Sequence, residues 1–191
     1  ALPLLDGESE IVLTSPLESS AYVDMTILAL SEFGVDIIKK NNRFIINPQK
    51  YISKGNYKVE GDWSNAAFWI VADKLSGNIE VSGLSLLSAQ GDKEILNILD
   101  KTEIDASEIP DLVPILSVLA CGRQGKTVIK NASRLRLKES DRLSAMVDVI
   151  TALGGEAYAD SDSLTVIGTG GLKGGVADGV NDHRIVMSAG I

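Results

Sequence analysis

Four cations gather around the carboxylate of Glu139 in a short stretch of this sequence, between Arg134 and Arg142. In an extended segment, alternation places Arg134, Arg136 and Lys138 on one face and the intervening leucines on the other. Arg142 then falls in the first turn of a predicted helix, where unpaired N–H groups and the helix dipole favour a bound phosphate or carboxylate. Glu139 stands among these cations, which favours its charged form. The pattern indicates an anion-binding site; the alternative is a solvated strand edge whose charges discourage aggregation.

Two other segments carry residues suited to acid–base or anion chemistry. His183, the one histidine of the chain, is followed by Arg184 at another predicted helix start. Asp111 lies in the first turn of an otherwise apolar predicted helix. Each segment has a structural alternative: the residues before His183 can simply cap a helix, and a carboxylate near a helix start is favourable without any catalytic role.

The composition excludes several classes of protein. The chain has 191 residues, of which 45% are hydrophobic and 23% charged, which suits one large or two small globular domains. A net charge of −8 disfavours a nucleic-acid-binding protein, because such proteins present broad basic faces. No apolar run reaches the roughly 18 residues of a membrane span. Glycine-rich nucleotide loops and His/Cys metal spacings are also absent, so we expect no cofactor, metal or membrane.

The single cysteine, Cys121, lies in an apolar run. One cysteine cannot form a disulfide framework, and the expected compartment is therefore the reducing cytoplasm. A buried structural thiol is the favoured interpretation over a nucleophile. The chain starts without Met and stops within a predicted helix, so we treat it as a fragment.

Internal repetition is the main organisational signal. In each unit a small-residue helix ends at a glycine, a β-rich stretch follows, a second amphipathic helix comes next, and a strand pair completes the unit. The predicted first helices are 64–76, 110–121 and one opening at Asp182, and the β-rich stretches are 9–13, 78–84 and 126–132. The predicted second helices are 22–33, 93–99 and 140–153, with further strands opening at Phe44 and Leu164.

The middle repeat departs from this pattern, because the chain runs from Asp100 directly to Lys101 without the expected strand pair. Either the repeat has lost a hairpin near 100–101 or the sequence omits a stretch. A boundary near 55–61 divides the chain into domains 1–60 and 61–191. Repeated helix-and-strand units predict an α/β architecture built by pseudo-symmetry.

Two segments carry a resemblance to a known family. Residues 137–143 (Leu-Lys-Glu-Ser-Asp-Arg-Leu) and 181–187 (Asn-Asp-His-Arg-Ile-Val-Met) resemble signature segments of the 5-enolpyruvylshikimate-3-phosphate synthases, in the same order. Residues 59–64 resemble the crossing into the second domain of that family, and 19–26 resemble a substrate-contacting segment of its first domain. Enzymes of the family are considerably longer than this chain.

The resemblance implies a fold and an activity. The fold is two inside-out α/β barrels, each of three βαβαββ units, of which this chain would hold the end of the first and most of the second. The activity is transfer of the enolpyruvyl group of phosphoenolpyruvate to the 5-hydroxyl of shikimate 3-phosphate, by a cofactor-free, monomeric enzyme. The implied substrate-binding residues are Ser19, Tyr22, Asp111, Arg134, Lys138, Arg142 and Arg184, and the implied catalytic residues are Asp111, Lys138, Glu139 and His183.

The expected chemistry fits these residue types. Addition to the enol ether needs a base at the hydroxyl and an acid at the methylene carbon, for which we assign Asp111 and Glu139. Cations stabilise the carboxylate and the departing phosphate. Arg134 stands where many relatives carry an asparagine. Several active-site segments of the family are absent here, and we expect the chain alone to be inactive.

Two alternatives remain open. The related enolpyruvyl transferase that acts on UDP-N-acetylglucosamine shares the repeat and the donor but uses a loop cysteine, whereas Cys121 lies in an apolar predicted helix. The second alternative is a non-catalytic anion-binding module that kept the repeat and lost the chemistry.

Overall fold

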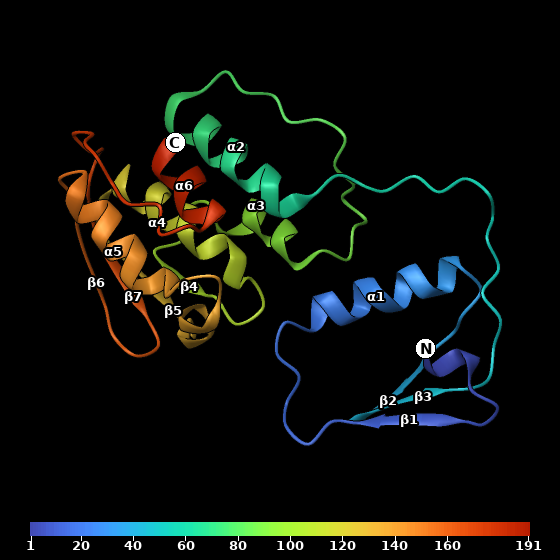
Figure 1. Ribbon diagram of the computed structural model, residues 1–191. Coiled ribbons are helices and arrows are strands. Elements are labelled where there is room, and N and C mark those ends of the chain that lie inside the picture. Colours follow the sequence, from blue (N-terminus) through green and yellow to red (C-terminus); the bar gives the residue numbers. More distant parts are fainter. The chain divides into compact units, whose positions relative to one another are not determined.

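The computed structural model describes residues 1–191, and contacts divide the chain into two compact units, Ala1–Glu60 and Gly61–Ile191. Each unit has its own sheet (Figure 1). No helix in the chain is both long enough and apolar enough to span a bilayer.

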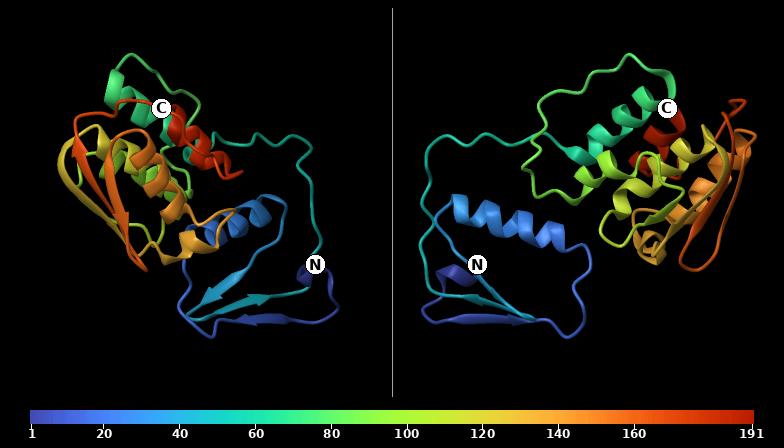
Figure 2. Two further views of the ribbon diagram at one scale, coloured as in Figure 1. Left: turned by 60° about the vertical axis from the view of Figure 1, so that its left-hand side comes forward. Right: turned by 180° about the vertical axis from the view of Figure 1, so that it is seen from behind.

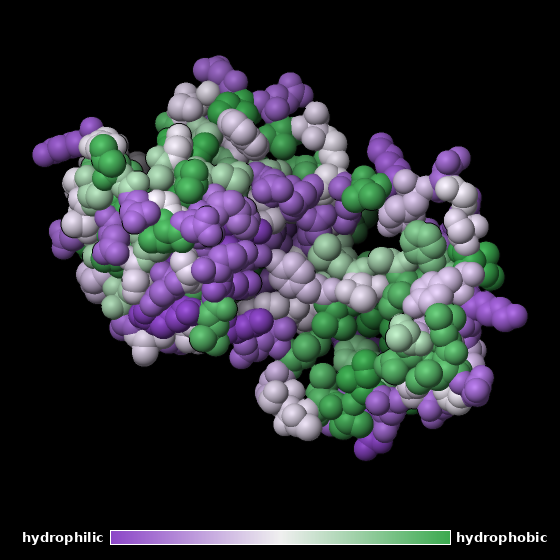
Figure 3. All heavy atoms as spheres, viewed as in Figure 1, coloured by the Kyte–Doolittle hydropathy of each residue, from purple (hydrophilic) through white to green (hydrophobic).

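The first unit is a small sheet with one helix. It consists of η1 (Leu2–Leu4), β1 (Ser9–Val12), α1 (Ser20–Glu32), β2 (Ile38–Lys40) and β3 (Arg43–Ile46). The strands form an antiparallel sheet in the order β1-β3-β2, and Phe44 and Ile46 are buried on it. α1 buries none of its residues. Figure 3 accordingly shows hydrophobic side chains gathered on the surface of this unit, which is the blue part of the ribbon in the same view in Figure 1.

The second unit holds the larger sheet and most of the helices. Its four strands run in the order β4-β5-β7-β6; β4 is parallel to β5 and the other pairs are antiparallel. In chain order its elements are α2 (Trp63–Ser76), η2 (Gly91–Glu94), α3 (Ile95–Ile98), β4 (Glu103–Asp105), η3 (Pro110–Leu112), α4 (Val113–Cys121), β5 (Gln124–Lys130), η4 (Ser133–Leu137), α5 (Arg142–Ala152), β6 (Glu156–Ala159), β7 (Leu164–Thr169) and α6 (His183–Gly190).

Helix α4 lies at the centre of this unit. All nine of its residues are buried, as expected for a helix that is apolar on every side. α4 and α5 cover one face of the sheet, and α2 and α6 pack against α4 (Figures 1 and 2). Burial of each large apolar side chain stabilises such a core by about 1.5–3 kcal/mol.

Three helices of the second unit begin at an aspartate that accepts a backbone N–H of the first turn. Asp62 accepts from Ser64 at the start of α2, and Asp182 accepts from Arg184 at the start of α6. Asp141 does the same for α5. Each such cap stabilises its helix by about 1 kcal/mol. The predicted helices 64–76 and 140–153, and the helix opening at Asp182, are confirmed.

Two local predictions were wrong. Residues 78–84 form no strand: positive φ angles at Gly77 and Asn78 turn the chain, and the Ile79 N–H donates to the Asp73 side chain instead of a ladder partner. Of the stretch 134–138, residues 134–137 are not extended but belong to the 3-10 helix η4, and only Lys138 after it is extended. The residues of η4 therefore do not alternate between two faces.

Candidate functional site

The charged residues of the second unit meet around Arg142. Its side chain is 1% exposed and contacts three carboxylates. Nε donates to Asp182 Oδ2 at 2.8 Å, Nη1 donates to Asp111 Oδ1 at 3.0 Å, and Nη2 donates to Glu139 Oε2 at 2.5 Å. Burial works to lower the pKa of Arg142, but the hydrogen bonds and charge of Asp182, with Glu139 and Asp111, outweigh burial and raise it. Arg142 is therefore a permanent buried cation that ties three segments together.

Asp182 is the buried counterpart of this arginine. Its side chain is fully buried; besides Arg142 it accepts the Ser140 hydroxyl at 3.0 Å and the Arg184 N–H at 3.0 Å. Burial works to raise the pKa of Asp182, but the hydrogen bonds from Arg142, Ser140 and the Arg184 backbone outweigh burial and lower it. One carboxylate thus caps α6 and fixes the first residue of α5 at the same time.

Asp111 is the point where the more exposed cations converge. Lys138 Nζ lies 3.1 Å from its Oδ1, which Arg142 also contacts, and Arg184 Nη2 lies 3.3 Å from its Oδ2. Arg184 Nη1 also donates to the Asp111 carbonyl oxygen at 3.4 Å. Glu139, by contrast, is 52% exposed and reaches solvent. The cluster therefore has a buried interior of Arg142 and Asp182 and an open edge of Glu139 and Lys138, whereas Asp111 and Arg184 are mostly covered.

The cluster forms where helices begin. Asp111 lies in η3, two residues before α4 begins, Arg142 is the first residue of α5 and Arg184 is the second residue of α6. Their contacts bring these three helix N-termini together. Each N-terminus carries about half a positive charge, so the dipoles add to the field of the three cations. Mobile anions and negative groups formed during a reaction are stabilised in such a place.

A fourth carboxylate lies close to the cluster. Asp92 in η2 is buried, and its burial, followed by the charge of Asp111, raises its pKa to about 6. Arg184 works in the opposite direction. No group of three or more His, Cys, Asp or Glu side chains is arranged so that it could hold a metal ion.

The structure thus brings together five of the residues that the sequence singled out. Asp111, Lys138, Glu139, Arg142 and Arg184 form the cluster just described.

The other predicted site residues are not among these five. His183 begins α6 with an exposed side chain, its Nδ1 3.9 Å from Asp182 Oδ1. Arg134 is exposed on η4. Ser19 and Tyr22 belong to the first unit, at the start of α1, where Ser19 is buried with a left-handed φ of 51°.

The sequence analysis did not predict the buried ion pair of Asp182 with Arg142, and it did not single out the buried Asp92. Asp182 was expected only as a helix cap, because nothing in the sequence shows that its second oxygen faces Arg142. Asp92 follows Gln90 and Gly91 with no spacing that indicates burial.

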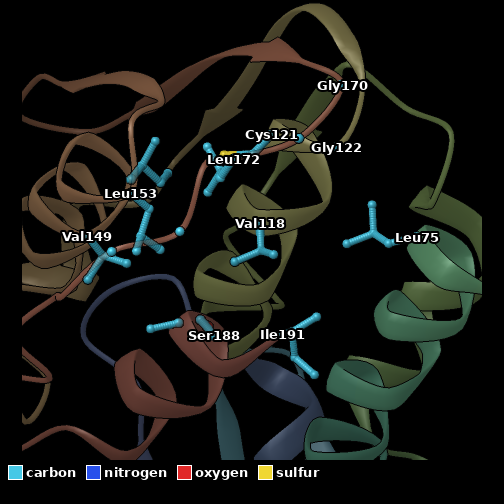
Figure 4. Close-up of a pocket in the computed structure, with 15 residues that line it drawn as sticks. Leu75, Val118, Cys121, Gly122, Val149, Leu153, Gly170, Leu172, Ser188 and Ile191 are labelled. Carbon is cyan, nitrogen blue, oxygen red and sulfur yellow. The ribbon is translucent and has the colours of Figure 1, made fainter.

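An apolar pocket lies elsewhere in the second unit. It measures about 460 Å³ and is lined mainly by apolar and glycine residues, including Leu75, Val118, Cys121, Leu153 and Leu172 (Figure 4). Cys121 and Gly122 place it at the C-terminal end of α4, whereas Asp111 precedes the N-terminal end of that helix. The pocket and the charged cluster are therefore separate features.

Comparison with known proteins identifies close relatives. The family described as EPSP synthase (3-phosphoshikimate 1-carboxyvinyltransferase) matches residues 1–108 and 99–191. A 3-phosphoshikimate 1-carboxyvinyltransferase of Clostridium acetobutylicum is 46% identical over 211 residues, covering 100% of this chain and 49% of the relative. The protein of the same name from Clostridium novyi is 43% identical over 212 residues, with the same coverage. The chain thus spans about half the length of the curated relatives it matches.

A solved structure shares the fold. The EPSP synthase of Acinetobacter baumannii matches with a TM-score of 0.76 at 21% identity, covering 95% of this chain and 49% of the other. This likeness confirms the predicted α/β fold, in truncated form.

Proposed function

The chain belongs to the EPSP synthase family, and from this premise we propose that its protein transfers the enolpyruvyl group of phosphoenolpyruvate to the 5-hydroxyl of shikimate 3-phosphate, releasing phosphate. The observation that carries the proposal is the cluster of Asp111, Lys138, Glu139 and Arg184 around Arg142, where three helices begin. It combines two carboxylates for proton transfer with cations for two anionic substrates.

The geometry supports distinct roles for the two carboxylates. Asp111 contacts three cations at the edge of the cluster, and we assign it as the base that accepts the hydroxyl proton of the acceptor. Glu139 is half exposed and held by a single arginine nitrogen, so it can deliver a proton to the methylene carbon. After addition, the tetrahedral intermediate loses phosphate and a proton leaves the methyl group, with the two roles reversed.

The cations divide into open and buried groups. Lys138 lies at the open edge and Arg184 is partly exposed beside Asp111; we assign these two cations the phosphoenolpyruvate carboxylate and the developing phosphate charge. Arg142 holds the carboxylates in place. Because the Arg142 side chain is buried, a direct contact between Arg142 and phosphoenolpyruvate would require Glu139 to move aside. His183, exposed beside Arg184, would support the same donor site.

The first unit would supply further contacts to shikimate 3-phosphate. We assign these to Ser19 and Tyr22, and on the second unit to Arg134. The left-handed backbone of Ser19 at the start of α1 is a conformation that costs a non-glycine residue free energy, and such outliers are found at ligand sites. The protein would act as a monomer in the cytoplasm, and the 191-residue chain alone would not turn over substrate.

We also propose that the chain is a piece whose middle repeat lacks a hairpin near 100–101, with domains 1–60 and 61–191. The alignment with the C. acetobutylicum relative spans 211 positions and this chain has 191 residues, so at least 20 positions face gaps in this chain. The two segments matched by the family overlap at residues 99–108. In the structure, β4 follows α3 after a four-residue connection, Leu99–Thr102.

The test is a chimera in which this chain replaces the matching half of the C. acetobutylicum relative, made with and without the relative's own residues restored between Asp100 and Lys101. We expect phosphate release that requires both substrates, reduced about 10²-fold or more by Asp111→Ala and by Glu139→Gln. Glu156→Gln, an exposed carboxylate on β6, is the matched control and should leave the rate unchanged.

Three outcomes separate the hypotheses. Turnover with both substrates that the two carboxylate variants abolish supports the transferase. A folded chimera that binds phosphate or phosphoenolpyruvate without turnover supports the non-catalytic module. Turnover of UDP-N-acetylglucosamine would support the related transferase; the structure argues against that reaction, because Cys121 is buried in α4 and burial raises the pKa of its thiol to about 11.

A further inference from the structure

We propose that residues 78–84 are a strand without its partner, and that they form a docking site for a β-hairpin that this chain lacks. The hairpin would supply the strand pair missing from the middle repeat, so the inference rests on the hairpin loss proposed above. It does not depend on the proposed reaction, because its test measures strand pairing rather than turnover.

Two repeats of the chain are complete, and they build the same three-stranded arrangement. In the first unit the order is β1-β3-β2, and in the second unit β5, β7 and β6 follow the same order. In each repeat the strand before the second helix pairs antiparallel with the last strand, which also pairs with the middle strand. In both complete repeats, the strand before the second helix is therefore covered by the last strand of its own repeat.

In the middle repeat, residues 78–84 occupy the place of β1 and β5. They follow α2 as β5 follows α4, and η2 and α3 come after them as α5 comes after β5. Figure 1 draws this stretch as a long connection without an arrow between α2 and α3. The chain then passes from α3 to β4 over four residues, so the middle repeat has no last strand to pair with 78–84.

The length missing from the chain fits one hairpin. The two complete hairpins, Ile38–Ile46 and Glu156–Thr169, span 9 and 14 residues. The C. acetobutylicum relative has at least 20 positions that face gaps in this chain. The gap thus accommodates a hairpin together with its connections.

Residues 78–84 keep the side-chain pattern of a strand. Ile79 and Val81 are half-buried. The residues that follow each of them, Glu80 and Ser82, are exposed, which is the alternation of a strand with one covered face. The segment therefore presents an apolar face to the unit and a polar face to solvent.

Contacts with α2 hold the segment near both ends, but its backbone is unpaired between them. The Ile79 N–H donates to the Asp73 side chain at 3.0 Å. The Trp63 indole N–H donates to the Ser85 carbonyl oxygen at 3.1 Å. No hydrogen bond between backbone groups joins residues 80–84 to another segment. Such an unpaired row of N–H and C=O groups is a template for an added strand.

A groove beside the segment has room for the side chains of a partner strand. It measures about 470 Å³ and lies between the segment, α2 and α3. Its apolar lining includes Ile70, Ile79, Val81, Leu84 and Leu96. The last strands of the complete repeats bury apolar side chains of their own, Phe44 and Ile46 on β3 and Leu164 and Val166 on β7. The occupant should therefore pair antiparallel with 78–84 and present an apolar face to this groove.

A hairpin fits this site better than a second copy of the chain. In both complete repeats the covering strand is itself paired with a middle strand, so neither edge of it is left unpaired. A second copy lacks the same hairpin and can offer only its own unpaired segment.

The test adds a synthetic peptide to the 191-residue chain; the peptide has the residues of the C. acetobutylicum relative that face the gap. Amide hydrogen exchange, followed by NMR, measures strand pairing directly. We expect exchange of alternate backbone amides within 78–84 to slow about tenfold or more at saturating peptide, because every second residue of an antiparallel strand bonds to its partner. The amides of α1, in the first unit, should not change.

Two variants with the same substitution on opposite faces provide the control. Val81→Asp places a charge in the apolar groove and should weaken peptide binding about tenfold or more. Ser82→Asp lies on the exposed face and should change the binding by less than about twofold. If Val81→Asp does not fold, the amide pattern of the wild type decides alone.

Each outcome decides the proposal. Alternate protection within 78–84 together with selective weakening by Val81→Asp supports it. Absence of binding, binding that leaves 78–84 unprotected, or equal weakening by both variants overturns it. Protection that grows with protein concentration without peptide, with a dimer in ultracentrifugation, identifies a second copy as the occupant and also overturns it.

A restored chain replaces the peptide if the peptide is insoluble. It carries the relative's residues between Asp100 and Lys101, and alternate protection of 78–84 in it supports the strand assignment, whereas its absence overturns that assignment. A chimera without turnover would count against the proposed reaction and leave these exchange patterns unchanged, so the two failures are distinguishable.

Discussion

Replacing Arg142 by methionine should leave the carboxylate of Asp182 buried without its counter-charge. The methionine retains an apolar side chain of similar length, so the loss is chiefly electrostatic. Removing one partner of a buried ion pair costs about 3–5 kcal/mol. With a urea dependence of about 1–3 kcal/mol per molar, the unfolding midpoint should fall by about 2 M.

The chain offers a selective assay for this loss. Both tryptophans, Trp63 and Trp69, lie in α2, so tryptophan fluorescence reports unfolding of the second unit alone. Lys130→Met is the matched control, because Lys130 pairs with Glu103 on the exposed surface and such pairs contribute about 0–1 kcal/mol.

The pH dependence gives the sharper test. In the wild type the folded-state pKa of Asp182 is lowered, so its contribution is present above the unfolded pKa and is lost as the pH falls through the folded value. Without Arg142, burial raises the pKa of Asp182 instead, and the variant loses stability as the pH rises. The difference in free energy of unfolding between variant and wild type should therefore be largest near pH 7 and shrink towards about pH 4. A loss of stability in Arg142→Met that is no greater than that of Lys130→Met, or that does not depend on pH, would refute this reasoning.

Three further predictions concern the rest of the second unit. Gly168→Ala should destabilise it by about 1–3 kcal/mol in urea unfolding, because a Cβ would lie 2.1 Å from the Ala120 carbonyl oxygen. Gly190→Ala, which meets nothing within 4 Å, should cause no loss. Cys121 should react with a thiol reagent only as fast as the unit opens, since burial raises its pKa to about 11; fast labelling of the folded chain would contradict this. Restoring the relative's residues between Asp100 and Lys101 should raise the urea midpoint, because β4 now pairs with β5 alone; an unchanged or lower midpoint would count against a missing hairpin.

The elements that the sequence predicted correctly are those whose signal is local. Asp62 and Asp182 sit directly before small-residue or apolar runs, and α2 and α6 begin there. The uniformly apolar run of α4 likewise predicts a helix buried on all sides. Charged residues next to helix starts indicated separate candidate segments, each with a structural alternative, and only the family resemblance joined Asp111, Lys138 and Arg184 in one site.

The errors arose where distant contacts override the local pattern. Alternation in 134–138 resembles a strand, but Leu135 is buried and Leu137 is exposed because the segment turns as η4. The Arg136 side chain donates hydrogen bonds to the Asp141 carboxylate and to the Asp160 carbonyl oxygen, and the prediction of an extended segment included neither contact. Asp92 shows the same limit: only its contact environment distinguishes it from an ordinary surface carboxylate.

The residues of the cluster differ in exposure, and this difference determines which of them can meet a ligand. Arg142 and Asp182 are buried and satisfy each other, so their charges can fix positions but cannot readily meet a ligand. Arg184, Lys138 and Glu139 are progressively more exposed, and each remains attached to that buried pair directly or through Asp111. A reacting group at the open edge would therefore meet cations and a proton donor whose orientation is already set, and little reorganisation would accompany charge development. Under the proposed function, removal of Arg142 should consequently damage both stability and catalysis, whereas removal of Glu139 should damage catalysis alone.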